Sequence, residues 1–374
     1  MLLKRALRRM LLTLVCLVVA VAIGATTLLH LPPFGRLPRG KRLARIERSP
    51  NYRDGKFRNQ TPTTFGIQKG SRWSTLRRML WPDVPDLRPS RPLPAVHTDL
   101  HTLDREADVM IWFGHSSYFL QIGGRRILVD PVFHAASPFP FLVRPFEAEY
   151  NYSPADIPAV DALVITHDHY DHLDYKTVKA LRERIAHVVC PLGVGEHLER
   201  WGVDTARICE LDWYDTVTVD SLRFTLLPTR HFSGRGLTNS KALWGAYMLE
   251  SGGYTIYMGG DGGYDRHFKD AATRFPHIDL ALMEDGQYNT AWRHIHTLPE
   301  QLLQAMQDLR AHRYFTGHNS KFRLALHPWY EPLENAQRCA EADSTLHIIT
   351  PKIGEMVRLD DTLQTFEHWW RFED

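Results

Sequence analysis

The sequence predicts a mixed α/β domain rich in strands, preceded by one N-terminal transmembrane helix. Three observations support this expectation. Residues 10–29 form an uncharged apolar run, residues 31–104 are basic and rich in proline, and residues 105–374 alternate short β-branched runs with turns. The composition, 44% hydrophobic and 24% charged over 374 residues, is typical of a globular protein with enough apolar material for a core.

Residues 1–30 are expected to be a membrane anchor. The apolar run is about as long as a bilayer-spanning helix and follows Lys4, Arg5, Arg8 and Arg9. The alternative is a cleaved signal peptide. However, the apolar core of a signal peptide is usually shorter, about 7–15 residues, and no small-x-small cleavage site follows the run in this sequence. Basic residues flank both ends, so the positive-inside rule leaves the orientation open. Our working expectation is a single-pass protein of a bacterial inner membrane, with its domain on the periplasmic side.

Residues 31–104 are expected to be a basic juxtamembrane segment. Positions 36–92 hold fifteen Lys or Arg against four Asp or Glu. They are either a solvated linker or a basic apron on anionic lipid headgroups, at ~1 kcal/mol per residue near the surface. The stretch 73–82 combines Trp with Arg and suits a membrane interface or a domain entrance. The whole chain carries a formal charge of only +2, which gives no basis for nucleic-acid binding.

The domain at 105–374 is expected to consist mainly of strands, because its apolar runs are β-branched, aromatic and bounded by turn residues. One helix is expected where apolar residues from Tyr175 to Ile185 fall at helical spacing. Another is expected over 297–312, with Thr297 and Glu300 in capping-box spacing. The eight strand-like runs are 109–113, 117–122, 125–130, 162–166, 223–228, 254–260, 279–283 and 313–317.

The stretch THDHYDHLD, residues 166–174, places three histidines and three aspartates within nine positions. Neither solubility nor a packed core requires this composition, whereas imidazole nitrogen and carboxylate oxygen are preferred zinc ligands. The stretch follows an expected strand, and α/β sheets often place ligand sites at strand ends. It therefore predicts a metal site with enough ligands to serve two neighbouring ions. The ligand-type residues are His167, His169, Asp171 and His172.

Three other expected strands are each followed at once by a side chain that could complete this site. They are His231, Asp261 and His318, and glycines beside Asp261 let the backbone approach closely. Taken singly, each has an ordinary alternative as a loop histidine, a turn aspartate or a histidine at a strand end. Together with the 166–174 stretch, they give a count that matches two metals.

The order H-x-H-x-D-H, His, Asp, His resembles that of the dinuclear hydrolases in the metallo-β-lactamase superfamily. The stretches 113–133, 259–264, 286–301 and 317–329 look like the N-acylphosphatidylethanolamine-hydrolysing phospholipase D branch of that superfamily. The resemblance covers roughly residues 105–350. It implies a four-layer αβ/βα sandwich, in which two mixed sheets lie face to face with helices outside.

The resemblance also implies a ligand set for two zinc ions, although other divalent metals such as iron or manganese tolerate similar ligands. Two metals ~3.5–4 Å apart can share a hydroxide and clamp a phosphoryl group for in-line displacement. One ion takes His167, His169 and His231, the other takes Asp171, His172 and His318, and Asp261 bridges them.

Further site residues follow from the same motifs. Asp171 and His296 are the expected catalytic residues, with His296 donating a proton to the leaving group or contacting the phosphate. The alternative for His296 is a structural histidine at a helix entrance. His115 is expected beneath the site. Asp130 is expected to orient a ligand histidine, because such ligands usually donate their other N–H to a carboxylate. Tyr288 either contacts substrate or packs in the core.

Glu284 and Asp285 depart from the pattern of many relatives, which have apolar residues or proline there. Negative charge beside a site for anionic phosphate is awkward, so these residues leave the exact substrate open.

These features favour a membrane-anchored zinc phosphodiesterase of phospholipase D type, acting on N-acylphosphatidylethanolamine-like phospholipids. One alternative is a hydrolase of a lactone, β-lactam or other ester, and another is a non-catalytic metal-binding envelope protein. Nucleic-acid hydrolysis fits poorly, because the basic residues cluster near the anchor and not around the ligand loops. The expected partners are a membrane and a phospholipid or other membrane-associated small molecule. The oligomeric state stays open.

Overall fold

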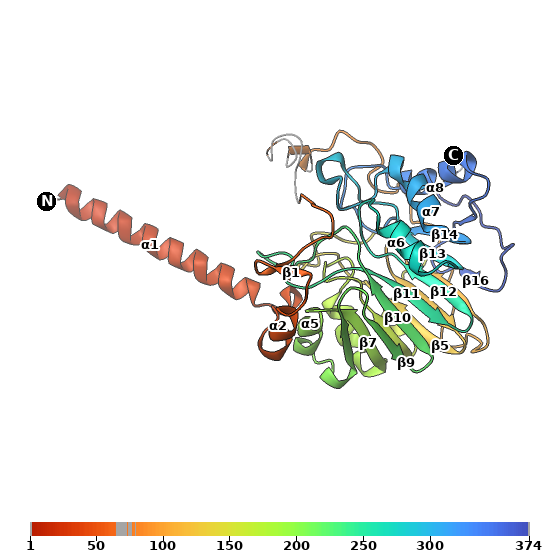
Figure 1. Cartoon of the computed structure of the whole chain (residues 1–374). Helices are drawn as coiled ribbons and strands as arrows, with labels where there is room; N and C mark the ends of the chain where they lie inside the picture. Colours follow the sequence, from red (N-terminus) through yellow and green to blue (C-terminus); the bar gives the residue numbers. More distant parts are fainter. Residues whose placement is uncertain (1, 65–72, 74–76, 79, 373–374) are drawn as a thin grey trace.

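Two seven-stranded sheets lie face to face, with helices on both outer faces (Figure 1). The computed structural model describes residues 2–64, 73, 77–78 and 80–372. The strand order is β16-β3-β4-β5-β6-β7-β8 in the first sheet and β15-β14-β13-β12-β11-β10-β9 in the second. This architecture confirms the expected four-layer αβ/βα sandwich.

Both sheets are mixed. In the first, β5 to β8 pair in parallel and the other neighbours are antiparallel. Its strands are β3 (Val109–Trp112), β4 (Tyr118–Ile122), β5 (Arg125–Val129), β6 (Val160–Val164), β7 (Ile185–Pro191), β8 (Ile208–Leu211) and β16 (Met356–Arg358). In the second, β12 to β15 pair in parallel. Its strands are β9 (Thr216–Val219), β10 (Leu222–Leu227), β11 (Ala246–Ser251), β12 (Tyr254–Met258), β13 (Leu280–Glu284), β14 (Arg313–Gly317) and β15 (Ile348–Ile349).

The alternation of side chains along each strand produces the layers. In β3, Met110 and Trp112 point into the core between the sheets, whereas Val109 and Ile111 pack in a second core under the outer helices. β11 shows the same alternation in the second sheet. Because both faces are covered, the strands are near-continuous apolar runs, which made eight of them recognisable in the sequence.

Five helices described in the domain cover the two sheets. They are α4 (Tyr175–Leu181) and α5 (Gly195–Arg200) on the first sheet, and α6 (His267–Arg274), α7 (Pro299–Leu309) and α8 (Glu331–Ala342) on the second. Short 3-10 helices are η1 (Pro32–Phe34), η2 (Pro154–Asp156), η3 (Arg182–Arg184), η4 (Thr205–Arg207) and η5 (Thr290–Trp292).

Two helix boundaries differ from the sequence prediction. Ile185 begins β7, because α4 ends at Leu181 and the 3-10 helix η3 follows. The capping box expected at Thr297 is also wrong, because the Thr297 hydroxyl donates to Gly262 O and Gln301 accepts the N–H of Leu298 instead.

The N-terminal helix α1 (Leu2–Leu29) projects away from the domain as a single rod (Figure 1). Within the described residues, its segment Lys4–Leu29 is the one helix long and apolar enough to cross a membrane, and its apolar window is unburied. The base of α1 lies beside α2 (Gly40–Ile46) and α5 (Figure 1).

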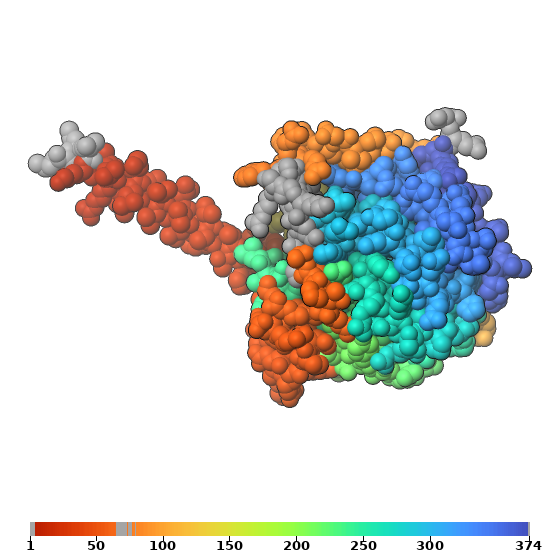
Figure 2. Space-filling view, turned by 45° about the horizontal axis from the view of Figure 1, so that its top comes forward, coloured from red at the N-terminus to blue at the C-terminus, as the bar shows by residue number. Residues whose placement is uncertain are grey.

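Part of the segment expected as a linker or lipid-facing apron is folded onto the domain, as the orange-red atoms in Figure 2 show. The hairpin of β1 (Tyr52–Arg53) and β2 (Lys56–Phe57) follows α2, and Ile46 and Phe57 are buried in the core between the sheets. Arg42 binds three carboxylates of the domain more than 150 residues away, a pairing that no local pattern predicts. Four of the ten residues in the stretch 73–82 lie outside the described residues.

Candidate metal centre

The side chains predicted as ligands lie at one edge of the sandwich, where strands of both sheets end. β5 and β6 are parallel neighbours, as are β12, β13 and β14, so their carboxyl ends meet at a common edge. The residues at or after these ends are Asp130 (β5), 166–172 (β6), Asp261 (β12), Glu284 (β13) and His318 (β14); His115 follows β3, and His231 follows β10.

One group of ligand atoms consists mainly of imidazole nitrogens. Nδ1 of His169 lies 2.9 Å from Nε2 of His167 and 3.2 Å from Nε2 of His231. With Asp261, these residues offer four ligand atoms that all lie within 4.8 Å of one another. Three ring nitrogens this close share at most a proton or two, which fits a common cation between them.

The second group combines His115, Asp171, His172 and His318, again within 4.8 Å of one another. Nε2 of His172 lies 3.6 Å from Oδ2 of Asp171, and Nε2 of His115 donates to the same oxygen at 2.9 Å. His115, which the sequence placed beneath the site, therefore lies within the second group, where it holds the carboxylate of Asp171.

Asp261 lies between the two groups. Its Oδ1 is 3.1 Å from Nε2 of His172 and 3.1 Å from Nδ1 of His318, on the side of the second group. Its Oδ2 is 3.7 Å from Nε2 of His167 and 3.6 Å from Nε2 of His231, on the side of the first group. One carboxylate oxygen thus faces each group, as a bridging ligand requires.

Contacts on the outer side of the rings set which nitrogen faces the site. Nδ1 of His172 donates to Oδ2 of Asp130 at 2.7 Å, and Nδ1 of His231 donates to the carbonyl of Ile295 at 2.8 Å. Asp130 also accepts from the backbone and the hydroxyl of Thr166. These contacts leave Nε2 of both rings free to bind a metal, the usual arrangement around ligand histidines.

Burial keeps the first group neutral. It lowers the pKa of His167 and His231 well below that of a free imidazole, and neighbouring histidines lower it further. Burial also lowers the pKa of His169 to about 4. Neutral imidazoles carry the lone pair that a metal needs. In the second group burial likewise lowers the pKa of His318, whereas for His172 the effect of burial is outweighed by the carboxylates of Asp261 and Asp171, which raise its pKa well above the ordinary value.

Buried polar atoms support the fit to a divalent ion. Within the described part of the chain, Nε2 of His172 and Oδ1 of Asp261 are buried and have no hydrogen-bond partner of good geometry, although they lie 3.1 Å from each other. Burial raises the pKa of Asp261 to about 6. Since an unpaired buried polar atom is costly, a cation at this position would relieve both.

His296 adjoins both groups through the rings of His231 and His318, whose centroids each lie 5.2 Å from its own. Its Nδ1 donates to Oε2 of Glu284 at 2.8 Å, and Oε1 of Glu284 accepts the backbone N–H of Thr297. Glu284, which the sequence marked only as an awkward charge, therefore orients His296. A carboxylate directly after a strand of the same edge was the signal available for this role.

Two other predicted neighbours lie in different surroundings. The hydroxyl of Tyr288 donates to Glu331 and accepts from Asn335, both on α8, and its ring stacks on His327. These contacts favour the core-packing role of Tyr288 over contact with substrate. Asp285 is buried, and burial raises its pKa well above the ordinary value.

The backbone is strained at this edge. His115, Asp130, Gln287 and His318 have φ values of 56°, 40°, 53° and 65°, in the left-handed region that side chains rarely adopt. Such residues concentrate where surrounding structure fixes a functional geometry.

A family model described as "Beta-lactamase superfamily domain" matches residues 125–319, just over half of the chain. The chain belongs to the beta-lactamase superfamily. The superfamily fold implies divalent-metal binding, and it accounts for the His and Asp groups found at the strand ends.

Relatives within the superfamily include a protein of Mycobacterium tuberculosis whose function is uncharacterised, 39% identical over 87% of this chain and 88% of its own length. The mitochondrial N-acyl-phosphatidylethanolamine-hydrolyzing phospholipase D of Saccharomyces cerevisiae is 29% identical over 62% of this chain and 51% of its own length. Igni18, a metallo hydrolase from Ignicoccus hospitalis, shares the fold with a TM-score of 0.52 at 20% identity, over 67% of this chain and 97% of that one.

Proposed function

We propose that the protein is a membrane-anchored dinuclear zinc phosphodiesterase of phospholipase D type, acting on N-acylphosphatidylethanolamine-like phospholipids. The observation that carries this proposal is the position of Asp261. Its two oxygens face two separate groups of ligand-type side chains, which come from different strand ends. Similarity to the yeast phospholipase D supports the substrate class.

The protein's own residues suit a phosphodiester. Two divalent ions at this site would supply Lewis acidity and an activated water without a Ser or Cys nucleophile. His296 is held through Nδ1 by Glu284, and its ring adjoins both ligand groups. Burial lowers the pKa of His296, so it must first be protonated to donate an Nε2 proton to the leaving alkoxide. Burial raises the pKa of Glu284 well above its ordinary value, so the carboxyl adds less negative charge beside a phosphate than the sequence suggested.

Apolar side chains near the base of α1 support a lipid substrate. The ring of Phe34, at the end of η1, contacts the ring of Phe139 and that of Tyr170. Tyr170 belongs to residues 166–174, here called the metal-binding stretch. Phe141 is 66% exposed and Leu237 is 86% exposed. Exposed apolar side chains grouped in this way are typical of membrane or partner contacts. They would hold the metal-site edge of the domain at the bilayer surface.

The direct test uses full-length protein in lipid nanodiscs, analysed for metal and then supplied with N-acylphosphatidylethanolamine. We expect two zinc ions per chain, release of phosphatidic acid and N-acylethanolamine, loss of turnover with a chelator and recovery with added zinc. The variant Asp261→Asn should hold less metal and lose turnover. Fully metallated protein that leaves this lipid intact contradicts the substrate. Turnover of a lactone or of nitrocefin would then favour a lactone or β-lactam hydrolase. A protein that hydrolyses none of these compounds would favour the non-catalytic metal-binding role.

A further inference from the structure

The short segment that follows α1 contacts the metal-binding stretch through a buried arginine. Arg235 is only 5% exposed. Its Nε and Nη2 donate to the carbonyl of Pro33 at 3.0 and 2.8 Å, and its Nη1 donates to the carbonyls of Asp168 and Leu173 at 2.7 Å each. These two carbonyls bracket residues 169–172, three of which are predicted ligands.

The same arginine is fixed by packing. Its guanidinium carbon lies 4.1 Å from the ring centroid of Tyr170, inside the metal-binding stretch, and 5.2 Å from that of Trp201. The Tyr170 hydroxyl donates to the backbone carbonyl of Arg235. Arg235 therefore contacts the metal-binding stretch at three of its residues. Through Nε and Nη2 it also contacts the segment Pro33–Arg36 after α1, here called the connector.

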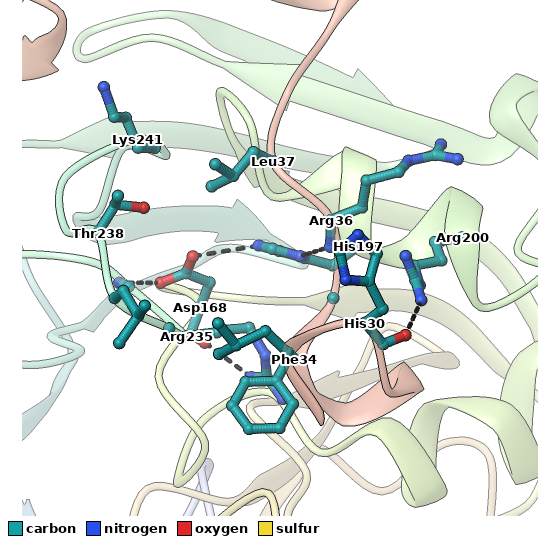
Figure 3. Close-up of a pocket in the computed structure, with 15 residues that line it drawn as sticks. His30, Phe34, Arg36, Leu37, Asp168, His197, Arg200, Arg235, Thr238 and Lys241 are labelled. Atoms are coloured by element: carbon teal, nitrogen blue, oxygen red, sulfur yellow. Dashed lines mark hydrogen bonds and ion pairs between the residues drawn. The ribbon is translucent and has the colours of Figure 1, made fainter. Parts of the chain in front are cut away.

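A second polar link runs beside the first (Figure 3). The backbone N–H of Arg36 donates to Nδ1 of His197 at 3.0 Å, and Nε2 of His197 donates to Oδ2 of Asp168 at 3.1 Å. The other oxygen of Asp168 accepts from the N–H of Gly234 at 2.6 Å. Asp168 stands between His167 and His169, so this link reaches the backbone that carries two predicted ligands.

These links line a cavity of about 380 Å³ at the base of α1. Its walls include Leu29 and Phe34 from the N-terminal segment, and Asp168, His197 and Arg235 from the domain (Figure 3). The connector therefore forms part of the wall of this cavity, beside the side chains of His197 and Arg235 that hydrogen-bond to the metal-binding stretch.

We propose that Arg235 and His197 are positioning residues that couple the connector Pro33–Arg36 to the metal-binding stretch. Residues 169–172 lie between β6 and α4 outside any regular strand or helix, so their shape depends on hydrogen bonds to their backbone. The planar guanidinium serves three carbonyls at once, which a lysine ammonium on a flexible stem does not reproduce. This inference rests on the proposed metal centre and not on its substrate.

The test compares zinc affinity in full-length Arg235→Lys and Arg200→Lys, measured by chelator competition below the unfolding temperature. Arg200 lines the same cavity and donates to His30 O at the end of α1, so it is a matched control. We expect Arg235→Lys to bind zinc about 10–100-fold more weakly, as loss of supporting contacts typically does. Arg200→Lys should stay within about twofold of wild type.

His197→Phe provides a second variant, because it keeps an aromatic ring beside Trp201 and removes both hydrogen bonds. It should weaken zinc binding in the same direction, and it decides the question if Arg235→Lys does not fold. A merely structural contact would lower the unfolding temperature and leave zinc affinity unchanged. If Arg235→Lys and His197→Phe both fold and bind zinc with wild-type affinity, the proposed positioning role is wrong and the metal centre is unaffected. A wild-type protein that binds no zinc overturns the metal centre together with that role.

Discussion

At the scale of single residues, the site depends on which ring nitrogen each histidine leaves free. Nδ1 of His172, His231 and His296 is occupied by a carboxylate or carbonyl, and Nε2 is left toward the ligand groups. The sequence predicted the ligand-type residues because four of them are crowded into one short stretch after a strand, and the other three come soon after apolar strands. It could not predict partners such as Ile295 O or Glu284, because these contacts depend on how separate loops pack together.

His296 provides the clearest test of a single residue. We expect His296→Gln to lower kcat about 100-fold or more with unchanged metal content, because general-acid catalysis contributes roughly that much. His267→Gln is the control: it removes another buried histidine, on α6, that belongs to none of the possible metal groups found among the described residues. Its kcat should be close to wild type. If His296→Gln loses metal in proportion to activity, His296 is a ligand and not the proton donor.

At the scale of elements, the eight predicted strands are largely buried, and the six missed strands of the two sheets include the short or edge strands β8, β9, β15 and β16 but also the interior strands β7 and β11. All eight predicted runs are strands in the structure. β7 was missed because its first residue, Ile185, continued a helical pattern, and the exposed residues of β9 lack an apolar run. The sandwich itself followed from the resemblance to a family, because local patterns do not specify which strands become neighbours.

The N-terminal segment shows the same difficulty. Its arginines suggested contact with lipid, yet Arg42 is 14% exposed and its guanidinium lies 2.6 Å from carboxylate oxygens of Glu196, which is buried, and of Glu210, which is partly buried. Removing one partner of a buried ion pair leaves the other unpaired, at a cost of several kcal/mol. This segment up to the β1–β2 hairpin therefore contributes to the stability of the domain.

Arg42→Ala should lower the free energy of unfolding by ~3 kcal/mol, because Glu196 and Glu210 lose their charged partner. Arg39→Ala should change it by less than ~0.5 kcal/mol, because Arg39 is 69% exposed and its ion pair with Glu196 is longer, at 3.4 Å. Denaturant titration of the full-length protein measures both. Equal, small effects would show that the segment is a detachable linker.

At the scale of the whole molecule, α1, the exposed apolar loops and the candidate metal centre lie at the same end of the domain. Leu237 stands on the loop that carries Arg235, and Phe141 stands on the loop whose Phe139 contacts Phe34. If α1 spans the membrane, these side chains meet the lipid headgroup region, and the substrate reaches the site without leaving the bilayer.

This orientation can be measured with an environment-sensitive fluorophore on one introduced cysteine, in full-length protein with Cys16→Ser and Cys209→Ser, which leaves only the buried Cys190 and Cys339 beside it. The label at Leu237→Cys should shift to the blue and be quenched by nitroxide lipids in nanodiscs. Leu363→Cys is a matched control, because Leu363 is 85% exposed and Leu237 is 86% exposed. The fluorophore at Leu363→Cys should show the emission of a label exposed to water and should not be quenched by nitroxide lipids. Equal signals from both positions would place the Leu237 loop away from the membrane.

The measurement that tests the central claim most directly is anomalous X-ray diffraction at the zinc edge from crystals of the metal-loaded protein. The account predicts two peaks ~3.5–4 Å apart, one among His167, His169 and His231, the other among Asp171, His172 and His318, with Asp261 between them. A single peak, or peaks elsewhere in the molecule, would contradict it.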